Sequence, residues 1–220
     1  MKLALFDLDN TLLSGDTDVE WLDFLIGQGV LPESHRRANL EMDRRYRSGE
    51  AAALEYVRFY LRFYPAHDMA TLLGLRERFV QERIEPRMLP AARKLIQSHK
   101  RDLVAIITAT NRFLTEPIAA AFGVEHLIAT EPQIEHGRFT GDIVGAPCMR
   151  EGKIVHLERW LAARGTTLGD FPESWFYSDS INDLPLLSRV THPVAVDADA
   201  KLGKIAGDRG WRKLTLRGSS

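Results

Sequence analysis

Several features are absent from the sequence, and each absence excludes a class of protein. Its single cysteine, Cys148, excludes an internal disulfide framework and a zinc site built from several cysteines. So little cysteine fits a reducing compartment, and we expect the chain to be cytoplasmic. Lysine and arginine total 29 against 30 aspartate and glutamate residues, so no basic excess predicts nucleic-acid binding. No apolar run approaches the roughly 18 residues that a membrane span needs, and we expect no membrane partner.

Hydrophobic residues make up 45% of the sequence, enough for a sizeable core, and they fall in segments that alternate between strand-like and helix-like patterns. Short apolar runs rich in β-branched or aromatic residues predict buried strands over 3–6, 103–107, 175–177 and 193–196. Helical spacing predicts helices over 90–97, 113–122 and 154–164 and from residue 184, while 127–134 and 138–144 suggest a hairpin. This alternation predicts an α/β fold with a Rossmann-like parallel sheet.

The stretch between the first two strands has a different pattern. Apolar residues from Trp21 to Phe79 recur at helical spacing, interrupted by Pro32 and Pro65. We therefore expect an inserted helical cap over residues 16–83, and a core domain made of 1–15 and 84–220. A length of 220 residues accommodates one domain with such an insertion.

Acidic residues follow two of the predicted strands. Asp7 and Asp9 are two positions apart at a strand end, so their side chains share a face and repel each other. A hard divalent cation would relieve this repulsion, and Asp179, after another strand, could complete its oxygen ligands. The carboxyl ends of parallel strands are also where ligands bind in open sheets. The alternative is that Asp7 and Asp9 form a turn or cap a helix, which aspartate also favours.

Other polar residues stand at similar places. Thr108 follows the strand over 103–107 and opens a helix, whose free N–H groups could bind phosphate. Residues 178–183 place two acids, an amide and two serines at a strand-to-helix turn, where Asp183 or Ser180 could simply be a helix cap. Lys153 begins another predicted helix and could equally be a solvated surface lysine.

Taken together, these residues resemble the haloacid dehalogenase-like superfamily over nearly the whole chain. Residues 7–11 match its first motif, DxDx(T/V), and Thr108 matches the Ser or Thr of its second. Lys153 stands where the third-motif lysine is expected. Residues 178–183 resemble the fourth motif, GDGxND, with serines in place of both glycines. The helical insertion resembles the cap of the phosphoserine phosphatase-like branch, subfamily IB. The residues of the fourth motif resemble those of a group of bacterial hydrolases, and some relatives of that group are histidinol-phosphate phosphatases.

The resemblance implies a magnesium-dependent phosphomonoesterase that acts through an aspartyl-phosphate. Asp7 would be the nucleophile and Asp9 the general acid and base, a residue that members cleaving carbon–halogen bonds generally lack. Mg²⁺ would be held by Asp7, Asp179 and the backbone carbonyl of Asp9. The remaining implied roles are phosphate binding by Thr108, the N–H of Ala109 and Lys153, orientation of Lys153 or the metal waters by Asp183, and substrate contact by Asn182.

The cap is expected to select the alcohol. Phosphoserine phosphatases read the substrate's amino group with an acid at about the place of Asp16, and its carboxylate with an arginine in a later cap helix. Counting from Gly49 places Tyr60 at the arginine position, with Arg58 two residues earlier on a different side of the helix. Asp16 and Arg58 are the cap candidates for substrate binding, and ordinary helix surface is an equal alternative for Arg58 and Tyr60.

Several functions remain open from the sequence. An acid without a matching arginine suits an amine that lacks a carboxylate, such as histidinol phosphate or another amino-alcohol phosphate. Phosphoserine phosphatase and a phosphotransferase that passes the phosphoryl group to an alcohol are the enzymatic alternatives. A non-catalytic phosphometabolite-binding protein is the third, and the protein is expected to be a monomer or homodimer.

Overall fold

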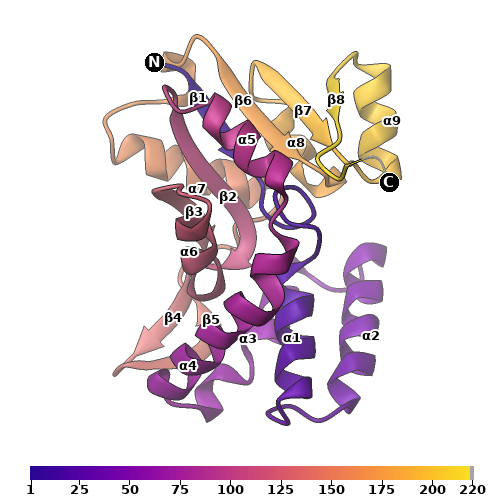
Figure 1. Ribbon diagram of the computed structural model, residues 1–220, viewed down its shortest axis with the longest axis vertical. Helices are drawn as coiled ribbons and strands as arrows, with labels where there is room; N and C mark the ends of the chain where they lie inside the picture. The colour runs from indigo at the N-terminus through magenta and orange to yellow at the C-terminus, as the bar shows by residue number, and fades with distance from the viewer. Residues whose placement is uncertain (219–220) are drawn as a thin grey trace.

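The computed structural model describes residues 1–218 and confirms the expected α/β fold (Figure 1). Residues 219 and 220 of the expected core domain lie outside the described residues. A parallel sheet has the strand order β3-β2-β1-β6-β7-β8. Its strands are β1 (Leu3–Phe6), β2 (Leu103–Asn111), β3 (His126–Thr130), β6 (Ser174–Ser178), β7 (His192–Val196) and β8 (Arg212–Leu214).

Helices cover both faces of this sheet, which explains why its central strands are apolar on both sides. All four residues of β1 are buried. Ala4 and Phe6 pack in one hydrophobic cluster with residues of α5 (Pro90–Ser98) and α6 (Arg112–Ala121). Leu3 and Leu5 pack in a second cluster with residues of α7 (Glu151–Ala162), α8 (Leu184–Leu187) and α9 (Ala200–Asp208). The central strand is therefore held on both faces, and its carboxyl end is fixed.

The strand order reverses beside β1. From this strand the chain order runs through β2 and β3 to one edge, and through β6, β7 and β8 to the other. Such a reversal leaves a crevice at the carboxyl ends of the two central strands, where ligands bind in open α/β sheets. Asp7 follows β1 and Asp179 follows β6, so both acids lie at this point.

Most of the chain between β1 and β2 is helical and lies beyond the carboxyl ends of the strands (Figure 1). Trp21, Phe24 and Phe79 pack ring against ring here, with centroids 5.0–5.7 Å apart. The apolar stripe is thus core, as the helical spacing indicated. Its helices are α1 (Thr17–Gly27), α2 (Ser34–Ser48), α3 (Ala53–Leu61) and α4 (Met69–Phe79), followed by a π-helical turn, Val80–Ile84, and a 3-10 turn, Glu85–Arg87; another 3-10 turn, Tyr64–Ala66, separates α3 from α4.

The expected hairpin over 127–134 and 138–144 is half wrong. Residues 126–130 form β3 and join the main sheet beside β2. The hairpin is the shorter pair β4 (Pro132–Glu135) and β5 (Arg138–Ile143), and Phe139 packs on Tyr64 of the helical region, with ring centroids 5.1 Å apart. An apolar run followed by a polar turn looks the same whether it is one long strand or two short ones. Elements α9 and β8 were not anticipated.

Two chain segments connect the helical region to the sheet, and they lie side by side. Leu13 and Met88 form an isolated antiparallel bridge. The N–H of Ser14 donates to the carbonyl of Arg87 at 2.9 Å, and that of Leu89 to the carbonyl of Leu12 at 3.2 Å. These crossings fall close to the expected boundaries at 15/16 and 83/84, although the division into two domains stays a prediction. Across residues 1–218, every helix is too short or too polar to cross a membrane.

Candidate active site

The loop after β1 turns sharply and holds Asp7 at the carboxyl end of the central strand. The N–H of Asp7 donates to the carbonyl of Tyr177 at 2.9 Å, which extends the strand pairing by one residue. The N–H groups of residues 11–13 then all turn back to the carbonyl of Leu8. Asn10 has a φ of 58°, a left-handed conformation that asparagine tolerates better than most residues. The motif thus encodes the turn as well as the acids.

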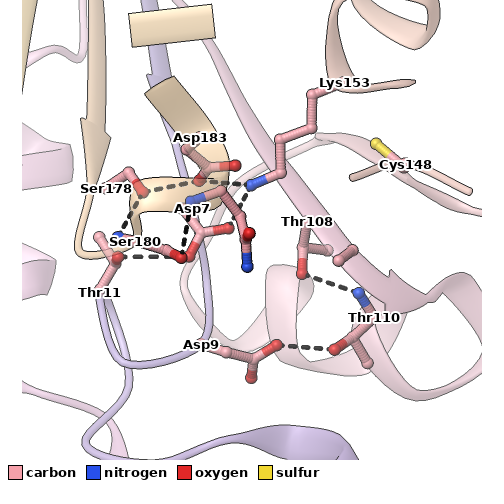
Figure 2. A network of polar contacts seen from close by, with 12 residues as sticks. Asp7, Asp9, Thr11, Thr108, Thr110, Cys148, Lys153, Ser178, Ser180 and Asp183 are labelled. Atoms are coloured by element: carbon pink, nitrogen blue, oxygen red, sulfur yellow. Dashed lines mark hydrogen bonds and ion pairs between the residues drawn. The ribbon is translucent and has the colours of Figure 1, made fainter. Parts of the chain in front are cut away.

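Asp7 is paired with a buried lysine. The Nζ of Lys153 lies 2.7 Å from Asp7 Oδ1 and 2.7 Å from Asp183 Oδ2, and Figure 2 shows it reaching between the two carboxylates. Only 2% of Lys153 is exposed, so it is not a solvated surface lysine. Burial lowers its pKa, but the charges of Asp183 and Asp7 outweigh burial, and the net shift is upward. Ser178 donates a hydrogen bond of 2.6 Å to the same oxygen of Asp183, which therefore has two donors.

Gly152 allows Lys153 to reach this position. A Cβ atom at residue 152 would lie 2.1 Å from the carbonyl oxygen of Pro147, which is far inside van der Waals contact. The first turn of α7 therefore packs directly on the backbone of the preceding loop. Arg150, just before this helix, has a φ of 51° and also departs from ordinary backbone geometry.

Gly152→Ala is expected to lower the melting temperature and the activity, because backbone must move to admit the methyl group and Lys153 moves with it. The expected loss of stability is about 1–3 kcal/mol, measured by thermal or urea unfolding. The matched control is Gly74→Ala in α4, where a Cβ meets no atom within 4 Å. That change should stabilise by up to about 1 kcal/mol. Equal effects of the two changes would contradict the packing argument.

A second acid, the half-buried Asp179, lies across from Asp7. Thr11 Oγ1 accepts from the N–H of Asp179 at 3.1 Å and lies 3.0 Å from Asp179 Oδ1 and 3.3 Å from Asp7 Oδ2. Its one proton can satisfy only one of the two carboxylates at a time. Burial raises the pKa of Asp7 to about 7, against the opposing charge of Lys153. Burial and the charge of Asp7 raise the pKa of Asp179 to about 8. This pair is short of positive charge, which fits a hard cation such as Mg²⁺.

The carboxyl group of Asp9 has partners of its own. Its Oδ1 accepts from the N–H of Thr17 at 2.8 Å and from the Thr17 hydroxyl, and its Oδ2 accepts from Thr110 at 2.7 Å (Figure 2). Within residues 1–218, no three carboxylate, imidazole or thiol side chains gather around one point. The structure therefore does not bring the carboxylates of Asp7, Asp9 and Asp179 together as one metal site. Ligation by the Asp9 carbonyl stays a prediction.

The remaining core residues predicted for the site lie around this crevice. Thr108 is buried within β2, where its Oγ1 accepts from the N–H of Thr110 at 3.2 Å, and Ala109 is the next residue. Asn182 precedes Asp183 in the fourth motif, and its side chain already has a partner: its Oδ1 accepts from the Nε of Arg150 at 3.3 Å. The guanidinium of Arg150 lies 4.7 Å from the ring centroid of Tyr46 in α2. Arg150, which sequence reasoning missed, thus connects the helical region to the fourth motif.

The predicted cap residues are placed differently from one another. Asp16 caps α1, with Oδ1 accepting from the N–H of Val19 at 3.1 Å, and its carboxyl lies close enough to Asp9 to raise the pKa of that group. Arg58 forms two hydrogen bonds of 2.9 and 2.6 Å to Asp142 of β5, and half of its side chain is exposed. Tyr60 is buried, not surface. Asp16 lies near the crevice, whereas Arg58 ties α3 to the hairpin.

Sequence reasoning also missed three hydroxyl residues that orient the acids: Thr11, Thr17 and Thr110. Thr11 is part of the first motif, so the motif itself was a signal. Thr17 and Thr110 carried none, because hydroxyl residues at such places are ordinary helix caps. Cys148 is buried as expected of a structural thiol, and burial raises its pKa to about 12.

Residues 4–188 match the family of haloacid dehalogenase-like hydrolases. A histidinol-phosphatase from Neisseria meningitidis is 39% identical over 220 residues, covering 98% of this chain and 99% of that protein. A phosphoserine phosphatase from Mycobacterium tuberculosis is 33% identical over 223 residues, covering 97% of this chain and 70% of that protein.

Solved structures are similar too. A protein of unknown function from Bordetella pertussis is 46% identical, with a TM-score of 0.94 and 98% of each chain covered. A substrate-bound phosphoserine phosphatase is 19% identical, with a TM-score of 0.68, and covers 98% of this chain and 93% of its own. At that identity the likeness is one of fold alone.

The chain belongs to the haloacid dehalogenase-like hydrolases. Within that family it is a phosphatase, a phosphoric monoester hydrolase, with the fold and cap of the phosphoserine phosphatase-like branch.

Proposed function

We propose that the protein hydrolyses a small phosphomonoester through an aspartyl-phosphate on Asp7, and that the alcohol it releases carries an amine or imidazole. The observation that carries the mechanism is the buried carboxylate of Asp7, fixed between Lys153 and Thr11 at the reversal point of the sheet. A nucleophile needs a fixed direction of attack, and these two contacts supply it.

In the first step an oxygen of Asp7 attacks phosphorus, and the bond from phosphorus to the ester oxygen breaks. Asp9, as the neutral acid, gives its proton to the leaving oxygen, so that an alcohol departs. Burial and the charge of Asp16 raise the pKa of Asp9 to about 6, although hydrogen bonds from Thr17 and Thr110 oppose the rise. A pKa in this range lets one group give and regain a proton near neutral pH.

In the second step water attacks the phosphorus of the aspartyl-phosphate. Its proton passes to the Asp9 carboxylate, and the bond from phosphorus to Asp7 breaks. Inorganic phosphate leaves, Asp7 is again a carboxylate, and Asp9 is again an acid. The proton lost in the first step is thus recovered in the second, and the net reaction consumes one water.

The other residues handle the charge of the phosphoryl group. Lys153 offsets negative charge beside Asp7, and Asp183 and Ser178 hold the lysine in place. Thr108 and the N–H of Ala109 would bind a phosphoryl oxygen. Mg²⁺, held by Asp7, Asp179 and the Asp9 carbonyl, would supply the additional positive charge that phosphoryl transfer needs.

An amine- or imidazole-bearing alcohol is favoured by the charges around the crevice. Asp16 and Asp18 lie at the start of α1, close enough to Asp9 that their negative charges influence one another's pKa values. Arg58, the candidate for binding a carboxylate, is instead bonded to Asp142. Histidinol phosphate has the cation and lacks the carboxylate, and the full-length likeness to a histidinol-phosphatase supports the same choice. Phosphoserine, phosphoryl transfer to an alcohol, and binding without catalysis remain the alternatives.

A phosphate-release screen tests this proposal. Histidinol phosphate is expected to show a kcat/KM at least about ten-fold above that of phosphoserine, a difference of about 1.4 kcal/mol in transition-state binding. Sugar phosphates provide a neutral comparison, and a matched sample in EDTA should be inactive until Mg²⁺ is restored. A preference for phosphoserine would overturn the substrate assignment, and activity unaffected by chelation would overturn the metal. Tight binding without hydrolysis of any ester would indicate a binding protein.

A further inference from the structure

The buried hydroxyl of Thr110 contacts two acidic side chains of the site, and no role described so far accounts for it. It lies in β2, two residues after Thr108, and is 3% exposed. Its hydroxyl oxygen is 2.7 Å from Asp9 Oδ2 and 3.4 Å from Asp18 Oδ2 (Figure 2 shows the first contact). Asp9 lies in the loop that leads into α1, and Asp18 lies in the first turn of that helix. Thr110 belongs to the sheet and follows Asp9 by 101 residues in the chain.

Thr110 can donate only one of these two hydrogen bonds at a time. A threonine hydroxyl has one proton, so it cannot donate to both carboxyl groups at once. The contact to Asp9 is the shorter one, so the hydroxyl donates its proton to Asp9. The contact to Asp18, at 3.4 Å, is the weaker of the two.

The result is that both oxygens of Asp9 are held. Thr17 holds Oδ1 through its N–H and hydroxyl, and Thr110 holds Oδ2. With one anchor the carboxyl group could still rotate about its bond to the Cβ atom. With two anchors on opposite oxygens its plane is fixed, which proton transfer to one particular ester oxygen requires.

We propose that Thr110 is a positioning residue, whose hydroxyl fixes the carboxyl group of Asp9 in the orientation from which it protonates the leaving oxygen. The inference rests on the proposed role of Asp9 as general acid. The plain alternative is that the Thr110 hydroxyl merely satisfies a buried polar group and affects stability alone.

The leaving group separates these two roles. An alkyl alkoxide is a poor leaving group and needs the proton, whereas p-nitrophenolate is stable without it. Thr110→Val removes the hydroxyl at nearly constant shape. We expect its kcat/KM on an alkyl phosphate such as histidinol phosphate to fall about a hundred-fold, while kcat/KM on p-nitrophenyl phosphate stays within a few-fold of the original. This ratio reports the step that releases the alcohol, and not the hydrolysis of the aspartyl-phosphate that both substrates share. Thr110→Ser, which keeps the hydroxyl, should recover most of the alkyl activity.

The control and the contrary outcomes are as follows. Equal losses of kcat/KM on both substrates, or Thr110→Ser as poor as Thr110→Val, would overturn the positioning role. If Thr110→Val does not fold, the same pair of substrates is compared in Thr110→Ala, where the smaller side chain cannot clash. The parent reaction is checked separately with Asp7→Asn. An inactive Asp7→Asn together with an unchanged Thr110→Val overturns this inference alone, whereas an active Asp7→Asn overturns the proposed function.

Discussion

Asp7→Asn is expected to reduce phosphate release by at least about a thousand-fold, because an amide oxygen is not a nucleophile that can form and release an acyl phosphate. The substitution preserves shape and leaves Lys153 paired with Asp183. The fold should therefore survive, and the melting temperature should stay within a few degrees of the original. The measurement is initial-rate phosphate release, combined with trapping of phosphorylated protein under acid quench, which should show the original chain labelled and the variant not.

Two results would contradict the nucleophile assignment. One is a variant that retains normal turnover, and the other is a phosphorylated residue other than Asp7. Asp102→Asn is a matched control, since Asp102 is hydrogen-bonded to His99 away from the strands' carboxyl ends. Its activity should be close to that of the original chain.

Lys153→Met should cost both activity and stability. The change leaves the carboxylates of Asp7 and Asp183 buried without their shared cation, and breaking a buried ion pair in this way costs about 3–5 kcal/mol. Phosphate release should fall by at least about a thousand-fold. Urea unfolding gives the stability, and rates with saturating substrate give the activity. Lys204→Met is the control, because its ion pair with Asp208 is mostly exposed and contributes little.

The stability loss in Lys153→Met should depend on pH in a definite direction. Burial already raises the pKa of Asp7 to about 7, above its unfolded value, and removing the lysine would raise it further. A carboxyl group with a raised folded-state pKa binds more protons in the folded than in the unfolded state, so stability is lost as the pH rises. Measured in EDTA, the variant should be closer to the original chain at about pH 5 than at about pH 8. The opposite trend would mean that Asp7 is not the group left unpaired.

The sheet and the positions of the acids could be predicted from sequence because both depend on local pattern. The run over residues 3–6 is apolar at every position, which indicates a strand buried on both faces. Motif residues then follow at strand ends, and parallel strands bring those ends together. Asp7, Lys153 and Asp183 were expected to meet on grounds of resemblance, and the distances of 2.7 Å bear out their proximity.

Pairings between distant side chains could not be predicted in the same way. Nothing local shows that Arg58 meets Asp142, 84 residues later. The count along its helix put Tyr60 at the arginine position and Arg58 on a different side. The partner of Asp9, Thr110, is 101 residues away. The sheet register that brings them together is set by burial of whole strands, not by the two residues concerned. The motif also gave no sign that the carboxyl group of Asp9 is hydrogen-bonded to Thr17 and Thr110.

The two anchors of Asp9 belong to different parts of the molecule. Thr17 is the first residue of α1, whereas Thr110 lies in β2 of the sheet, and the paired segments around Leu13 and Met88 connect the two regions. Any displacement that carries α1 away from β2 separates the anchors and frees the acid to rotate. Under the role proposed for Asp9, proton transfer therefore requires α1 and β2 to keep the relative position seen here.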